Sequence, residues 1–313
     1  ETLMLQPDLL EKAKDLKVVF TNLHGTGGII VTQMLKRLGF NFLTVPEQDV
    51  QDGAFPTVAS PNPENPPALA MAIELANREN GDIVMGTDPD CDRMGVAVRD
   101  AQGEMVLLTG NQIGSLLAYY RTKTLFDQGV LNDTNKAHAT LIKTFVTTNL
   151  QTEIANHYGI GCVNTLTGFK YIGQKLSKYE SAVPLPEGKT FSQLSPEETK
   201  ALQLEHSNYF VFGGEESYGY LGGDFIRDKD GNAAVVMFCE LAAYAVSRGM
   251  TVPDLMNEVY QKFGYYQEGL RSVVMEGAEG AGKIQRLANS YTQQPPSEVD
   301  GSAVTRVRNF AED

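Results

Sequence analysis

The chain has 313 residues, of which 42% are hydrophobic and 21% charged, proportions typical of a folded globular protein and unlike those of a disordered one. Its formal net charge of −13 repels nucleic acids and anionic membranes, so we expect neither as a partner. Its length suits about two domains of ordinary size.

The first third of the chain alternates short apolar strands with single helices. Lys17–Thr21 is a β-branched run that predicts a strand, and a glycine turn and apolar residues at helical spacing follow it. A second strand is expected at 40–45, a helix opens at Pro66-Pro67 after a long proline-rich loop, and a third strand covers 82–86. This alternation predicts a mostly parallel, mixed sheet flanked by helices, and we place the first α/β domain at residues 1–104.

The same alternation resumes after two paired strands at 94–98 and 105–108 and a helix capped by Thr109. We place the second α/β domain at residues 105–263. Its expected strands are at 140–145, 160–163 and 209–212, and its expected helices are at 148–157, from 168 onward, at 232–247 and at 252–263. Within this domain we expect an exposed excursion at 184–205. Residues 264–313 are expected to be a connecting tail that leads to a further C-terminal domain, with a glycine-rich connection before a helix at 284–290.

The compartment is indicated by the cysteines and by the hydropathy pattern. Cys91, Cys162 and Cys239 are far apart and odd in number, which argues against a disulfide framework and against a zinc site. No apolar run reaches the roughly 18 residues of a membrane span. We therefore expect a cytoplasmic protein. Because the chain starts with Glu1 and enters a helix-like segment at once, we expect it to be a piece of a longer one.

The acidic segment after the third predicted strand is the strongest chemical signal. Asp88, Asp90 and Asp92 occupy alternate positions at the carboxyl end of that strand, where open α/β sheets place their ligands. Three carboxylates that converge repel one another unless a hard cation such as Mg²⁺ neutralises them, and Arg93 adds a fork suited to a phosphate. The competing interpretation is a solvated acidic turn. An EF-hand loop is excluded because it needs glycine where Arg93 stands.

This segment resembles the Asp-x-Asp-x-Asp-Arg metal loop of the α-D-phosphohexomutases, the phosphoglucomutase and phosphomannomutase family. Other segments similar to motifs of that family occur in the family's order, and the resemblance covers residues 5 to about 262: Asn22–Gly27, Phe55–Val58, Pro61–Glu64, Thr167–Lys170 and Gly213–Tyr220. The resemblance implies that Asp88, Asp90 and Asp92 bind Mg²⁺ and that Gly213–Tyr220 is the sugar-binding loop.

Within that loop, Glu215 and Ser217 offer the acceptor and donor that sugar hydroxyls require, and we take them as substrate-binding residues. Lys170 stands at a predicted helix start and is a candidate phosphate contact; Arg93 and Lys170 are the candidate catalytic residues. Arg227 is a further substrate-binding candidate, although a surface ion pair explains it equally well. A structural role for His24 is at least as well supported as a catalytic one.

Three features depart from the family pattern or imitate other motifs. The sugar-binding loop ends Ser217-Tyr218-Gly219-Tyr220 without the commoner histidine, which resembles the branch acting on glucose or pentose phosphates. Ser60 imitates the phosphoserine loop, but it lies inside the metal-loop domain and is interpreted as an ordinary loop serine. Residues 277–283 have P-loop spacing, but Ile284 stands where Ser or Thr must hold Mg²⁺.

The resemblance implies an enzyme that moves a phosphoryl group between positions 1 and 6 of a hexose phosphate, through a phosphoserine and a hexose bisphosphate. The family's first domain, with that serine, and its fourth, with a phosphate clamp, have no match in the chain. We therefore expect hexose phosphates and the two missing domains of the same chain as partners, and no activity from this piece alone. The alternatives are a phosphopentomutase-type member, a non-catalytic metal-dependent sugar-phosphate binding module and a magnesium-dependent phosphatase.

Overall fold

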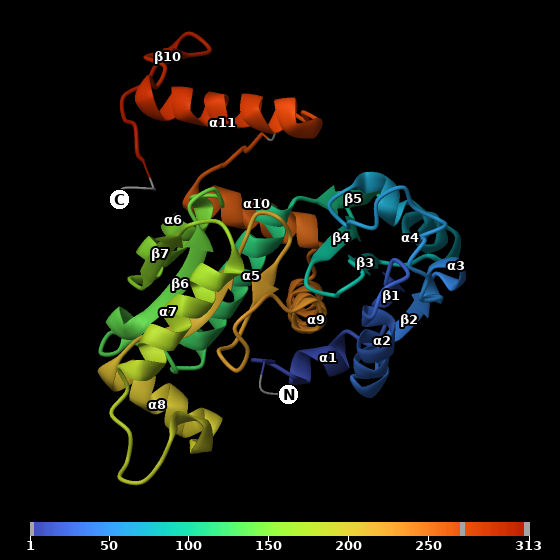
Figure 1. Ribbon diagram of the computed structural model, residues 1–313. Helices are drawn as coiled ribbons and strands as arrows, with labels where there is room; N and C mark the ends of the chain where they lie inside the picture. Colours follow the sequence, from blue (N-terminus) through green and yellow to red (C-terminus); the bar gives the residue numbers. More distant parts are fainter. Residues whose placement is uncertain (1–2, 270–272, 310–313) are drawn as a thin grey trace. The chain divides into compact units, whose positions relative to one another are not determined.

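A computed structural model describes residues 3–269 and 273–309 of the chain (Figure 1). The chain divides into two compact units, Glu1–Tyr266 and Gln267–Asp313. The first unit contains two sheets, each with helices on its faces, so the predicted α/β class with mixed sheets is confirmed.

The first sheet has the strand order β2-β1-β3-β4-β5, where β1 and its two neighbours are parallel and β4 and β5 are antiparallel. The strands are β1 (Lys17–Thr21), β2 (Asn41–Thr44), β3 (Ile83–Thr87), β4 (Met94–Arg99) and β5 (Met105–Leu108). The helices of this part are α1 (Asp8–Lys12), α2 (Gly27–Arg37), α3 (Pro46–Asp49) and α4 (Pro66–Glu79). Alternation along β1 separates the two faces, because Val18 packs in the core with Val31 of α2, and Val19 packs in the core with Ala72 of α4.

The second sheet has the order β7-β6-β8-β9, in which only the short β9 is antiparallel. Its strands are β6 (Ala139–Thr144), β7 (Gly161–Thr165), β8 (Tyr209–Gly214) and β9 (Tyr220–Leu221). The helices are α5 (Gly110–Asp127), α6 (Leu150–Tyr158), α7 (Phe169–Ser181), α8 (Pro196–His206), α9 (Gly231–Ser247) and α10 (Val252–Phe263), with short 3-10 turns at Lys136–His138 and Phe191–Gln193. Leu141 of β6 shares a core with Ile154 of α6, whereas Ile142 shares one with Ile172 of α7.

Helix α9 connects the two sheets. It contacts α1, α2 and β4 on one side and α5 and β9 on the other, and its buried side chains belong to a core cluster that includes both sheets. This shared core explains why residues up to Tyr266 form one compact unit.

The structure adds detail to three predicted segments. Strand β5 pairs with β4, so the first sheet extends to Leu108, and we keep the division of the domains at residues 104 and 105 as a proposal. The predicted excursion at 184–205 contains α8, which Ser195 caps through the Glu198 N–H and which buries Gln203. The long proline-rich loop that the sequence predicted before Pro66-Pro67 begins with α3.

The second unit contains α11 (Gly277–Gln293) and a hairpin of β10 (Glu298–Val299) and β11 (Ser302–Ala303). The glycine-rich residues 277–283 are part of α11, not the connection that the sequence predicted, and an ion pair between Lys283 and Glu279 one turn apart stabilises that turn. Among the described residues no single helix has the length and apolarity to span a membrane; α9 and α10 have them only together, as a pair bent by 85°.

Candidate functional site

The acidic loop follows β3 and brings its three carboxylates together. One ligand oxygen each from Asp88, Asp90 and Asp92 lies within 4.8 Å of the others. The loop curls back because the Asp88 Oδ1 atom accepts hydrogen bonds from the N–H groups of Asp92 (3.0 Å) and Arg93 (2.9 Å), while Cys91 takes a left-handed φ of 60°. The loop therefore has the form of a cradle of carboxylate oxygens.

A glycine turn after β1 supports this loop from behind. The backbone N–H and the hydroxyl of Thr26 donate to the Pro89 carbonyl at 2.8 and 3.1 Å. A Cβ on Gly25 would lie 2.2 Å from the Pro89 Cα, so no larger residue fits at this contact. His24, in the same turn, is buried and bonded to the Val50 carbonyl and the Thr57 hydroxyl, as expected of a structural histidine.

The negative charge of the three carboxylates is only partly compensated by neighbouring cations. Burial, together with the charges of Asp92 and Asp90, raises the pKa of Asp88 to about 7. The Arg93 guanidinium lies 3.3 Å from Glu64, but its Nε atom is 3.8 Å from Asp88 and 3.7 Å from Asp92. That Nε atom is buried without a hydrogen-bond partner among the described residues. Both the clustered carboxylates and the unsatisfied N–H are features that a cation and an anionic group would satisfy.

The predicted sugar-binding loop lies against the acidic loop. Gly219 and Arg93 form an antiparallel bridge, and the Met94 N–H donates to the Tyr218 carbonyl at 3.0 Å. The loop joins β8 to β9, so it leaves the carboxyl end of β8 just as the acidic loop leaves that of β3. The two predicted motifs, far apart in the sequence, are therefore brought together in the structure.

The two carboxylates of this loop have different partners. Glu215 Oε1 accepts the Gly168 N–H at 2.9 Å, directly before α7, and burial raises the pKa of Glu215. Glu216 Oε2 accepts from the hydroxyls of Thr144 and Thr147 at 3.1 and 3.2 Å. Ser217 is half-buried between these anchored parts of the loop.

The two outlying candidates differ in their surroundings. Lys170 is exposed in the first turn of α7, and its ammonium lies 5.0 Å from the ring centre of Tyr171. Arg227 forms an ion pair with Glu180 of α7 and donates to the Asp224 carbonyl, which is the surface pairing that the sequence left open. We therefore leave Arg227 out of the proposed site.

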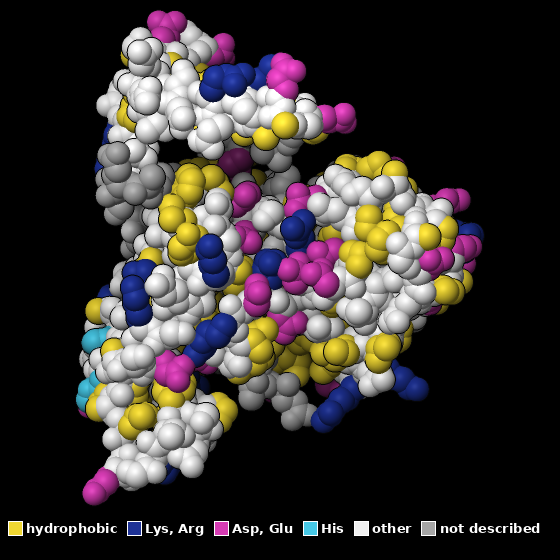
Figure 2. Space-filling model, viewed as in Figure 1, with side chains coloured by type: hydrophobic (Ala, Val, Ile, Leu, Met, Phe, Trp, Pro, Cys, Tyr) yellow, Lys and Arg dark blue, Asp and Glu magenta, His cyan; other side chains and the backbone are white. Residues whose placement is uncertain are grey.

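The sequence interpretation missed Lys229. Its Nζ atom lies 2.6 Å from Asp92 Oδ2, and its stem packs on Gly219, where a Cβ would lie 2.1 Å from the lysine Cδ. The lysine thus joins the acidic loop to the sugar-binding loop. Figure 2 shows basic and acidic side chains gathered in the middle of the face that it presents, between the parts formed by the two sheets. The available signal was that Lys229 is a second basic residue two positions after Arg227, but nothing local in the sequence distinguished the two.

The donor set fits a hard divalent cation. Three carboxylate oxygens form a partial shell and leave positions for water or a phosphate oxygen, as Mg²⁺ requires, and the cysteine of the loop, Cys91, is buried with its pKa raised to about 12 by burial. A thiol that holds its proton so firmly is a poor ligand for a soft metal.

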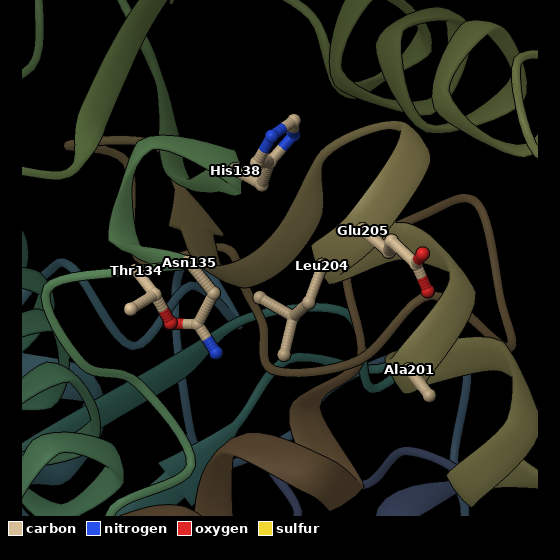
Figure 3. Close-up of a pocket in the computed structure, with 6 residues that line it drawn as sticks. All are labelled: Thr134, Asn135, His138, Ala201, Leu204 and Glu205. Atoms are coloured by element: carbon tan, nitrogen blue, oxygen red, sulfur yellow. The ribbon is translucent and has the colours of Figure 1, made fainter.

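A pocket in the described part of the chain lies elsewhere (Figure 3). It has a volume of about 400 Å³ and is lined by Thr134, Asn135, His138, Ala201, Leu204 and Glu205. His138 directly precedes β6, whereas Thr144, which contacts the sugar-binding loop, ends that strand. The pocket therefore lies at the opposite end of the second sheet from the acidic and sugar-binding loops.

Comparison with known proteins identifies both domains. The family profile described as phosphoglucomutase/phosphomannomutase, alpha/beta/alpha domain II, matches residues 5–103, and that of alpha/beta/alpha domain III matches residues 109–194 and 196–263. Phosphoglucomutases of Staphylococcus aureus, such as that of strain MRSA252, are 34% identical over 297 residues. That alignment covers 95% of this chain and 48% of the relative, so the chain spans about half the length of the curated relatives it matches.

Solved structures share the fold. A putative phosphomannomutase from Thermus thermophilus superposes with a TM-score of 0.59 at 20% identity, over 87% of this chain and 54% of that one. An Aspergillus fumigatus N-acetylphosphoglucosamine mutase, solved in complex with GlcNAc-6P and magnesium, superposes with a TM-score of 0.51 at 14% identity, over 88% and 55%. Because family profiles match most of the chain, it belongs to the phosphoglucomutase/phosphomannomutase family and carries that family's middle domains, II and III.

Proposed function

We propose that this chain forms the metal-binding and sugar-binding part of a Mg²⁺-dependent phosphoglucomutase that moves a phosphoryl group between positions 1 and 6 of a hexose phosphate. The S. aureus relatives are named phosphoglucomutases, and the sugar-binding loop lacks the histidine of the commoner family form, which favours glucose over mannose. The single observation that carries the proposal is the main-chain bridge between Arg93 and Gly219, because it joins a three-carboxylate cradle to a sugar-binding loop.

Each loop has a distinct task in this proposal. Asp88, Asp90 and Asp92 hold the metal, which when bound supplies positive charge against the negative charge that builds on a transferring phosphoryl group. The unsatisfied Arg93 Nε–H donates to an oxygen of the same phosphoryl group. Glu215 and Ser217 hold sugar hydroxyls.

Lys170 completes the substrate site in this proposal. It contacts the second phosphate from the first turn of α7, where free backbone N–H groups also favour an anion. Contacts to both hydroxyls and phosphate from separate loops suit a reaction in which the bisphosphate must bind in two orientations.

The phosphoryl donor is proposed to lie in another part of the full-length protein. The matched relatives are about twice as long as the aligned region, and Ser60, which imitates a phosphoserine loop, is exposed and accepts a hydrogen bond from Asn65. We therefore expect the chain by itself to bind metal and hexose bisphosphate without turning over. Its free cysteines support the proposed cytoplasmic location.

Calorimetry tests this proposal. Mg²⁺ is titrated into the chain alone and with glucose 1,6-bisphosphate, alongside Asp90→Ala. Binding that is lost in the variant supports the metal site. Binding of metal without any bisphosphate effect contradicts the sugar-phosphate function, and steady isomerisation by the chain alone contradicts the need for a donor elsewhere.

A further inference from the structure

The glutamate next to the predicted sugar ligand Glu215 has its carboxylate hydrogen-bonded to the turn that follows β6. Glu216 Oε2 accepts hydrogen bonds from Thr144 and Thr147, and its own backbone N–H donates to the Thr147 hydroxyl at 3.1 Å. Both threonines are buried, at 0% and 3% exposure, so these bonds are sheltered from water. A carboxylate held in this way has little freedom to turn toward a sugar.

The turn that carries the two threonines is itself held by a buried lysine. Lys143, on β6, is 0% exposed, and its Nζ atom donates to the Thr147 carbonyl at 2.9 Å. The two threonine hydroxyls lie 2.7 Å apart. A continuous chain of polar contacts therefore runs from the end of the central strand of the second sheet to the sugar-binding loop.

The main chain at Glu216 is also closely packed. A Cβ on Gly110, the first residue of α5, would lie 1.9 Å from the Glu216 carbonyl oxygen, so only glycine permits this approach. Glu215 and Glu216 are both half-buried, but Glu215 accepts the Gly168 N–H, directly before α7, and not the threonine hydroxyls. Adjacent glutamates thus face different elements.

We propose that Glu216 is a positioning residue: it fastens the sugar-binding loop to the Thr144–Thr147 turn, so that Glu215 and Ser217 are presented to the sugar in a fixed geometry. This inference rests on the proposed function for its effect on binding, but not for its effect on the loop itself. Glu216 makes no contact with substrate in this arrangement. A loop that is fixed before binding loses less conformational entropy when the sugar arrives.

The experiment compares Glu216→Leu, Glu216→Gln and the exposed control Glu187→Leu in the whole chain. Two quantities are measured: the affinity for glucose 1,6-bisphosphate in saturating Mg²⁺, and amide hydrogen exchange of residues 214–219 without ligand. Because Glu216→Leu loses the hydrogen bonds to the carboxylate, we expect amide exchange in this loop to be about tenfold faster and the affinity for the bisphosphate to be about tenfold lower. Affinity for Mg²⁺ alone is expected to stay within about twofold, and the control to change nothing.

The conservative variant Glu216→Gln distinguishes a role in holding the loop by hydrogen bonds from a role of the negative charge of Glu216. Glu216→Gln keeps a carbonyl oxygen for the two hydroxyls and is expected to restore exchange and affinity to within about threefold of the original. Thr147→Val, which removes one hydroxyl at constant shape, is expected to reproduce the effect of Glu216→Leu, and the double variant to be no worse than either single one.

Several results would overturn the inference. Unchanged exchange with lost binding in Glu216→Leu would make Glu216 a direct sugar ligand, and a glutamine variant as damaging as the leucine one would point to charge. Faster exchange throughout the chain would indicate a general folding defect instead. If the original chain binds Mg²⁺ but no bisphosphate, the proposed function fails, while the exchange comparison still decides whether Glu216 fastens the loop.

Discussion

Replacing Asp88 with asparagine is expected to stabilise the metal-free protein at pH 8 and to abolish its response to Mg²⁺. The side chain of Asp88 is only 10% exposed, and its Oδ1 atom accepts two backbone N–H groups that an asparagine oxygen also satisfies. The substitution therefore removes a buried negative charge while it keeps the hydrogen bonds that shape the loop.

The size of the effect follows from the raised pKa. The shift from 3.8 to about 7 corresponds to roughly 4 kcal/mol at 1.36 kcal/mol per pKa unit. Because the carboxyl group retains some contact with water, we take about half of this, or ~2 kcal/mol, as the expected gain. For a unit of this size that is a rise in Tm of roughly 4–8 °C.

The sign and the pH range follow from linkage. Below about pH 4 the carboxyl is neutral in both states and costs nothing. Between pH 4 and 7 the unfolded chain releases the proton while the folded chain keeps it, so the free energy of unfolding falls as the pH rises. The advantage of asparagine should therefore be small near pH 4 and complete above pH 7.

Thermal unfolding in EDTA, followed from pH 4 to pH 8, measures this gain, and repeating it with Mg²⁺ measures the response to metal. Asp90→Asn is the matched control, since it removes the same charge from an exposed position. A gain that does not depend on pH, or that is no larger than that of Asp90→Asn, would refute burial as the cause of the raised pKa.

Two further substitutions test the contacts of the acidic loop. Lys229→Met removes the cation nearest to Asp92 and leaves only the more distant Arg93, so we expect the metal-free protein to lose about 1–3 kcal/mol of stability and Mg²⁺ to restore most of it. Denaturant unfolding with and without metal measures this, and equal losses in both conditions would contradict this role. Gly25→Ala forces a methyl group against Pro89, so calorimetry should show weaker Mg²⁺ binding although no carboxylate has changed. The control is Gly53→Ala, which has open space around it and should bind Mg²⁺ normally. Normal Mg²⁺ binding by both variants would show that the acidic loop adapts to the methyl group.

Much of the fold follows from short-range patterns in the sequence. The strands from β1 to β8 were predicted within a few residues because each is a short apolar run bounded by turn residues. Helix α8 and the glycine-rich first turns of α11 were missed, since their exposed faces are polar and their hydrophobic periodicity is weak or interrupted by glycine, whereas the later part of α11 was predicted as a helix at 284–290. The pairing of β5 with β4 was predicted correctly from the turn between them.

The candidate site also has a part that the sequence predicted and a part that it did not. The Asp88–Asp92 cradle was predictable because its members are neighbours in the sequence and follow one strand. The pairing of Lys229 with Asp92, and of Glu216 with Thr147, joins residues that are remote in the chain, and no local pattern encodes such pairs. Positioning residues of this kind become visible only when the strand order is known.

The bridge between Arg93 and Gly219 has a mechanical consequence. It is made by backbone atoms, and a second backbone bond joins the Gly231 N–H at the start of α9 to the Cys91 carbonyl at 2.9 Å. Two of the residues that form these links are glycines whose Cβ would collide with neighbouring atoms, at 2.7 Å from the Cys91 oxygen for Gly231 and 2.1 Å from the Lys229 Cδ for Gly219. The spacing of the two loops therefore depends on the absence of a side chain at these two positions. Because both links are made by the main chain, they hold the acidic loop and the Gly213–Tyr220 loop together within the compact unit that ends at Tyr266.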